Sequence, residues 1–137
     1  MSRTIPVRHT IDERARRVVL TPGDDVTGAQ VSRYIVGLTT RRPELKGWDW
    51  VHDIRQSSGE VGNPDVVEVA SAFDDSPPGP TWTIFVTNDR NFYLWCKVMD
   101  AQFSGRTHLT ALTLYEAEEQ LDALRALNGP SRAPSSS

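Results

Sequence analysis

The chain has 137 residues, a length typical of one domain, and its net charge of −3 does not favour a protein held to nucleic acid by phosphate contacts. Its single cysteine, Cys96, excludes an intramolecular disulfide and a zinc site built from several cysteines. No apolar run approaches the roughly 20 residues of a membrane span, and no signal-peptide pattern opens the chain, so we expect a cytoplasmic protein without membrane insertion.

The first expected elements are two short strands. Ile5, Val7, His9 and Ile11 alternate with other residues, which is the period of a strand with one buried face. A second apolar run occupies residues 17–21 and is followed by a Pro-Gly turn signal. Because a short polar link joins the two runs, the pattern predicts an antiparallel hairpin.

Three arginines gather at the turn of this hairpin: Arg14, Arg16 and Arg17. A small charge cluster of this kind usually lies on a solvated face, and three arginines in an acidic chain do not support DNA binding. We therefore expect all three side chains to be exposed to solvent.

A helix is expected next, and its start is marked by a capping box formed by Thr27 and Gln30. Val26 and Val31 stand at the hydrophobic-staple positions around this box, and Pro43 prevents the helix from continuing. The spacing of i, i+3, i+4 and i+7 predicts one buried face. That face consists of Val31, Tyr34, Ile35 and Leu38.

Residues 48–54 form the third expected strand, with Trp48 and Trp50 on one face, and a loop rich in small residues follows it. A second helix is expected to begin with Asn63 as its N-cap and Pro64 at the first helical position, where a missing N–H costs nothing. Its apolar stripe consists of Val66, Val69, Ala70 and Phe73.

The last expected elements are two strands and two helices. Residues 82–86 are almost all apolar, as in an interior strand covered on both faces. A helix over residues 89–103 and a strand over residues 107–112 come next. Thr113 and Glu116 then provide another capping box for the final helix.

The resulting order is β-β-α-β-α-β-α-β-α, which predicts an α/β fold: an opening hairpin, then a mixed and mostly parallel sheet with helices packed on it. We expect a single domain over residues 1–129. Residues 130–137 contain mainly Ser, Pro and Ala, and we expect them to form a disordered C-terminal tail.

Two short motifs and the element order carry a resemblance to a known family. Residues 11–16 follow the pattern Ile-Asp-x-x-x-Arg between the first two strands, and Asp53 ends a strand before the second helix. The chain resembles STAS-like domains, such as anti-sigma-factor antagonists and uncharacterised bacterial STAS-like proteins. The resemblance implies a STAS-like α/β fold and a non-catalytic regulatory module that acts through contacts with another protein or with a second copy of itself.

The anti-sigma-factor antagonists carry a phosphorylatable Ser or Thr at the start of their second helix. This chain has Asn63 and Pro64 at that place, so we expect no serine switch there. Ser57, Ser58 and Gly59 lie several residues upstream and form the candidate phospho-acceptor or anion-binding loop.

An alternative function is the binding of a small ligand, an anion, a nucleotide or a lipid. In open α/β sheets, ligands bind beyond the carboxyl ends of the strands. The loop with Ser57, Ser58 and Gly59 follows one strand, and Asn88 follows the next. If this alternative holds, these residues line the ligand site.

The residues that could carry chemistry do not form a catalytic or metal-binding pattern. His9, His52 and His108 each lack a second His or Cys at metal-ligand spacing, so we expect no metal and no cofactor. His52 and Asp53 are adjacent in a strand and point to opposite faces, which argues against a catalytic pair. We expect Asp53 to cap the following loop, and we expect no enzyme activity.

The helix expected over residues 89–103 has two apolar stripes. The core stripe consists of Phe92, Trp95, Cys96, Met99 and Phe103. A second stripe consists of Leu94, Val98 and Ala101. This second stripe is either covered by a neighbouring helix or exposed as a partner surface, and the sequence leaves both alternatives open.

Overall fold

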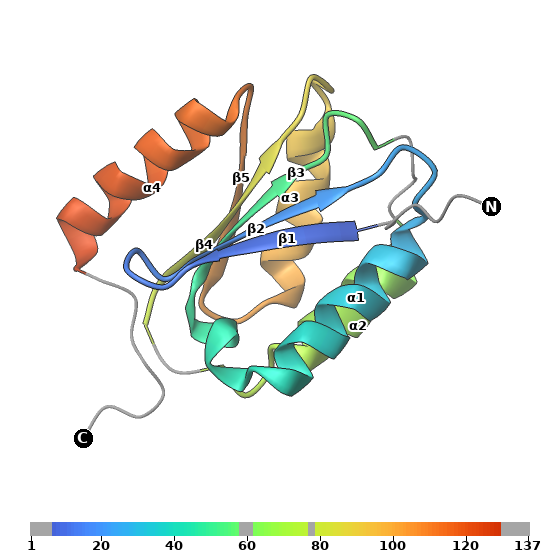
Figure 1. Cartoon of the computed structure of the whole chain (residues 1–137), viewed down its shortest axis with the longest axis horizontal. Helices are drawn as coiled ribbons and strands as arrows, with labels where there is room; N and C mark the ends of the chain where they lie inside the picture. Colours follow the sequence, from blue (N-terminus) through green and yellow to red (C-terminus); the bar gives the residue numbers. More distant parts are fainter. Residues whose placement is uncertain (1–6, 58–61, 77–78, 130–137) are drawn as a thin grey trace.

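The computed structural model describes residues 7–57, 62–76 and 79–129 (Figure 1). Its strands are β1 (Val7–Asp12), β2 (Arg17–Pro22), β3 (Asp49–Asp53), β4 (Thr81–Val86) and β5 (Arg106–Ala111). Its helices are α1 (Gly28–Arg41), α2 (Asn63–Ala72), α3 (Phe92–Gln102) and α4 (Leu114–Asn128), together with the short 3-10 helix η1 (Pro43–Gly47). The predicted order of strands and α-helices is confirmed. The predicted tail at residues 130–137 lies outside the described residues.

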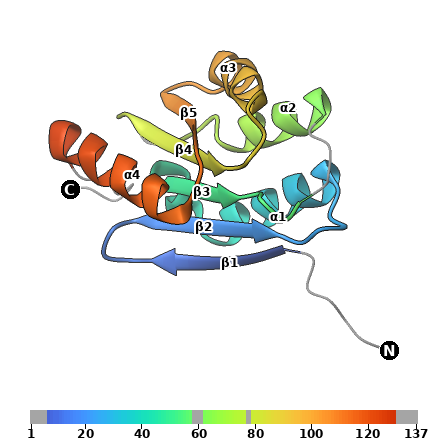
Figure 2. The same cartoon turned by 90° about the horizontal axis from the view of Figure 1, so that it is seen from above.

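The strands form one sheet in the order β1-β2-β3-β4-β5, and Figure 2 shows them side by side. β1 and β2 are antiparallel, and each later neighbour is parallel to the strand before it. The predicted α/β fold with a mixed, mostly parallel sheet is therefore confirmed. No helix within the described residues is long and apolar enough to cross a membrane.

Helices cover both faces of this sheet, with α4 on one side and α1 and α2 on the other (Figure 1). Because successive strand residues face opposite ways, neighbouring residues of β3 enter different cores. Trp50 packs in the core with α1, whereas Val51 packs in the core with α4. All six residues of β4 are buried, which confirms the expected interior strand.

The hairpin turn is held by Asp12, whose Oδ1 accepts the backbone N–H groups of Arg14 at 3.1 Å and Ala15 at 3.0 Å. The expectation that all three arginines there are solvated is wrong for Arg17. Its side chain is buried, and its guanidinium pairs with Glu118 at 2.5 Å and Asp122 at 2.7 Å on α4.

The capping box of α1 is confirmed in both directions. Gln30 donates its backbone N–H to Thr27 Oγ1 at 3.2 Å, and Gln30 Oε1 accepts the backbone N–H of Thr27 at 2.8 Å. Val26 and Val31 lie in the same core cluster, as expected of a staple. The sequence did not predict η1. A 3-10 segment of five residues is too short to show a repeating apolar pattern, and Pro43 indicates only that α1 has ended.

The other two cap predictions need correction. Asn63 is the first residue of α2 rather than its N-cap, and the Asp65 carboxylate accepts the N–H of Gly62, the true cap residue, at 3.2 Å. At α4, Thr113 Oγ1 accepts the N–H of Glu116 at 3.0 Å as predicted. The Glu116 carboxylate, however, bonds to the N–H of Leu112 at 3.0 Å instead of that of Thr113.

Candidate functional site

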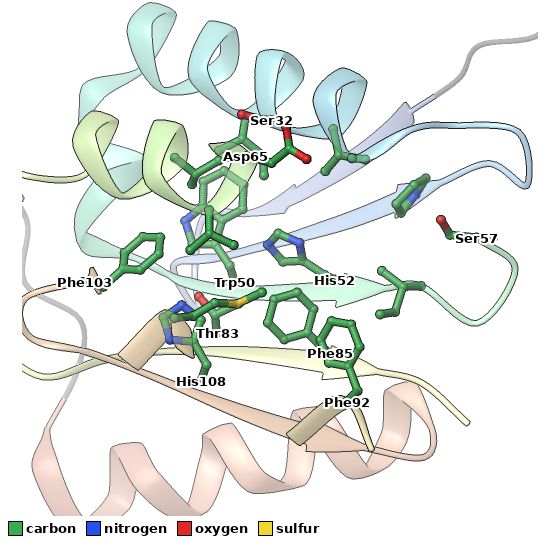
Figure 3. A pocket seen from close by; sticks show the side chains of 18 of the residues that line it. Ser32, Trp50, His52, Ser57, Asp65, Thr83, Phe85, Phe92, Phe103 and His108 are labelled. Carbon is green, nitrogen blue, oxygen red and sulfur yellow. The ribbon is translucent and has the colours of Figure 1, made fainter. Parts of the chain in front are cut away.

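A cavity of about 130 Å³ lies between the sheet and helices α1, α2 and α3 (Figure 3). Its floor is formed by strand residues that share one face of the sheet. Trp50 of β3 is in register with Thr83 of β4, which is in register with His108 of β5. His52 and Phe85 are in register two residues further along. Side chains of α1, α2 and α3 form the remaining walls.

His52 lies at the floor of this cavity, with 8% of its surface exposed. Its imidazole centroid is 4.9 Å from that of Phe85 and 6.0 Å from that of Trp50. It makes no hydrogen bond with any residue that the structure describes. Burial, together with the smaller effects of the neighbouring His108 and Arg106, lowers the pKa of His52 to about 3. The ring is therefore neutral near pH 7 and offers one N–H donor and one bare nitrogen acceptor.

His108 lines the same floor but has a partner. Its ring Nδ1 lies 2.9 Å from the Asp100 carboxylate, which also accepts the backbone N–H of His108 at 2.7 Å. Burial lowers the pKa of His108 to about 4, because its effect exceeds the opposing effect of the Asp100 hydrogen bond. The contact is thus a hydrogen bond from a neutral imidazole rather than an ion pair at neutral pH.

Arg106 is the buried cation of the cavity. Its two terminal guanidinium nitrogens donate to four oxygen acceptors at 2.7–3.1 Å: Lys46 O, Trp48 O, Trp82 O and Thr83 Oγ1. It forms no ion pair with a carboxylate of the described residues, and its guanidinium lies over the Phe73 ring at 5.0 Å. Burial lowers the pKa of Arg106 to about 10, so the group stays charged at neutral pH and places a cation in the wall of the cavity.

The rim of the cavity lies where α1 and α2 begin, beside the carboxyl ends of the strands. Thr27, Ser57 and Asp65 line it and are at least partly exposed. Of the loop expected to bind an anion, Ser57 therefore borders the cavity, whereas Ser58 and Gly59 lie outside the described residues. Asn88 is exposed and does not line this cavity, and its place in a ligand site stays a prediction.

The roles expected for Asp53 and Cys96 are confirmed. Asp53 does not pair with His52; it accepts the backbone N–H of Arg55 at 3.3 Å and the Arg55 guanidinium at 2.8 and 2.9 Å. Cys96 is buried in the core, and burial raises the pKa of its thiol to about 12. Such a thiol is almost entirely protonated at neutral pH and is a poor nucleophile.

Sequence reasoning did not find the cavity. The sequence suggested His52 only as a metal ligand or as part of a catalytic pair, and it suggested no role for Arg106. One signal was present: polar residues occur at positions 52, 83 and 108 of three neighbouring strands, and all three side chains face the same side of the sheet. Among the described residues, no group of three or more His, Cys, Asp or Glu side chains could hold a metal ion.

The second apolar stripe of α3 is exposed in the structure. Leu94 is 52% exposed, Val98 is 39% exposed, and Ala101 is also exposed. No helix of the described residues covers this stripe, so the alternative of coverage by a neighbouring helix is wrong for the single chain. Its role as a partner surface stays a prediction.

Replacing both Leu94 and Val98 with lysine should leave the free energy of unfolding within about 0.5 kcal/mol of the parent, because both side chains already contact water. Thermal unfolding followed by circular dichroism measures this. Met99→Lys is the matched control: the residue is buried one position further along the helix, and an unpaired charge there should cause a large loss. An equally large loss in the double variant would show that the stripe is covered.

Searches with models of known protein families and with the sequences of curated proteins found no match to this chain.

Proposed function

We propose that this chain is a non-catalytic domain that binds a small, mostly apolar ligand in the cavity between its sheet and helices α1–α3. The observation that carries the proposal is the cavity itself, about 130 Å³ in volume and lined mainly by apolar and aromatic side chains. An engineered cavity of about 150 Å³ in another protein binds benzene, so the space suits a ligand of similar size.

A pocket that opens at its rim and reaches down to the sheet needs a reason, because protein interiors are packed as densely as organic crystals and unfilled space is destabilising. Ligand pockets are the common exception, since they combine an apolar lining with a few polar groups. His52 and Arg106 are such groups here. The rim at Ser57 also lies near the carboxyl end of β3, the usual ligand side of an open α/β sheet.

A binding role is favoured over catalysis by the state of the reactive side chains. His52 and His108 have pKa values of about 3 and about 4, far below the range of an efficient general base at neutral pH. The Cys96 thiol is protonated. These groups suit recognition of a ligand better than proton transfer or nucleophilic attack.

A second candidate is a STAS-like regulatory module that acts through a protein partner, including a second copy of this chain. The element order and the exposed stripe of Leu94, Val98 and Ala101 favour it. A cytoplasmic location and a bacterial pathway belong to this hypothesis. Sedimentation of the parent and of the double lysine variant tests the self-association form: a parent that dimerises and a variant that does not would support it, and a monomeric parent would remove it.

Filling the cavity should abolish ligand binding. Val66 is buried on α2 and lines the cavity, so Val66→Phe should occupy the space, raise the melting temperature and remove the binding of toluene measured by calorimetry. Val67→Phe is the matched control, because Val67 is 41% exposed on the same helix and should keep parental toluene binding. A parent protein that binds no toluene would overturn the proposed function.

A further inference from the structure

We propose that the ligand of this cavity is a neutral molecule with an apolar body about the size of a benzene ring and one hydroxyl group, which hydrogen-bonds to the imidazole of His52. This inference rests on the proposed function and adds the chemical class of the ligand.

The first support is the unsatisfied imidazole. His52 is 8% exposed, points into the cavity (Figure 3) and has no hydrogen-bond partner among the described residues, so its ring nitrogens are open to a molecule in the cavity rather than sealed in the core. Its ring carries one donor and one acceptor, because burial keeps it neutral. A hydroxyl group both donates and accepts, so it satisfies whichever ring nitrogen faces it. A carboxylate can only accept, and an ammonium can only donate.

The second support is the charge of the surroundings. Arg106 places a buried positive charge in the wall of the cavity, which disfavours a cationic ligand there, whereas the Asp65 carboxylate lies at the rim. Four of its N–H groups are already used by Lys46 O, Trp48 O, Trp82 O and Thr83 Oγ1. Only the N–H on Nε has no acceptor among the described residues. A buried carboxylate would therefore find too few donors to replace its water shell, whereas a single hydroxyl needs one or two.

The third support is the shape of the cavity beside His52. The Phe85 ring lies 4.9 Å from the His52 ring and 4.9 Å from the Phe92 ring, in tilted arrangements typical of aromatic packing. Trp50 closes the other side of His52 with a centroid distance of 6.0 Å. An aromatic or short alkyl body placed here brings its hydroxyl to the imidazole.

Phenol and toluene test this inference, because they differ only by a hydroxyl group in place of a methyl group. Calorimetric titration of the whole chain at pH 7 should give a dissociation constant about tenfold lower for phenol than for toluene, since a site with unpaired polar groups discriminates against a ligand that leaves them unpaired. Benzoate should bind more weakly than phenol. His52→Leu should remove the preference for phenol while toluene still binds.

His9→Leu is the matched control. His9 lies on β1, bonds to the Tyr34 hydroxyl at 2.5 Å and does not line the cavity, so this variant should keep the preference for phenol. A measurement on the parent protein runs in parallel and does not depend on how the variants fold. The ¹⁵N resonances of the His52 ring should shift much more on addition of phenol than on addition of toluene, because only phenol hydrogen-bonds to the ring.

The remaining outcomes of these titrations distinguish a failure of the inference from a failure of the proposed function. Equal affinities for phenol and toluene would overturn the inference and leave the proposed function standing. Benzoate binding more tightly than phenol, or a phenol preference that survives in His52→Leu, would also overturn the inference alone. Failure of both phenol and toluene to bind would overturn the proposed function together with the inference.

Discussion

Replacing Asp49 with alanine should lower the free energy of unfolding by about 3 kcal/mol, because the change removes one partner of a buried ion pair and leaves the other partner unpaired. Asp49 is fully buried at the start of β3. Its carboxylate accepts two hydrogen bonds from the Arg125 guanidinium, at 2.6 and 2.8 Å, and one from the backbone N–H of Trp82 at 3.1 Å. The variant leaves a largely buried arginine and a buried N–H without this partner.

The matched control for this prediction is Asp75→Ala. Asp75 also forms an ion pair, with Lys46 at 2.8 Å, but its side chain is exposed to solvent. An exposed pair typically contributes about 0–1 kcal/mol, so the control should unfold close to the parent in urea titrations. Equal losses for the two variants would show that Asp49 does not tie α4 to the sheet.

Replacing Leu121 with alanine should destabilise the protein by about 2–5 kcal/mol, the usual range for a leucine truncated in a packed core. Leu121 is fully buried on α4 and packs with Ala117, Val51, Ile84 and Val86 in the core on that face of the sheet. Urea denaturation of the variant and the parent measures the difference.

Leu127→Ala is the control on the same helix. Leu127 is 84% exposed, so its truncation should change the free energy of unfolding by no more than about 0.5 kcal/mol. If the Leu121 and Leu127 variants were equally stable, the apolar residues between α4 and the sheet would not form the packed core that the structure shows.

The order of the elements could be predicted because its signals are local. The capping pair Thr27 and Gln30 lies within one turn, and the apolar run at residues 82–86 is visible without knowledge of its neighbours. Local patterns also placed Cys96 and Met99 on the buried face of α3. The error at Asn63 arose because two residues close together, Gly62 and Asp65, could form the cap without it.

The candidate site could not be predicted in the same way, because its contacts are distant in the sequence. Arg106 binds the carbonyl groups of Lys46 and Trp48 across 60 and 58 positions. The volume left between the helices and the sheet depends on how these distant side chains pack, which composition and periodicity do not encode.

Intermolecular nuclear Overhauser effects between toluene and the isotope-labelled protein test most directly whether the cavity binds ligands. Contacts should run from toluene protons to the methyl groups of Val66 and Met99, which line the cavity from α2 and α3. Contacts to Leu94 and Val98 alone, on the exposed stripe of α3, would contradict the account and place apolar binding on the surface of the protein.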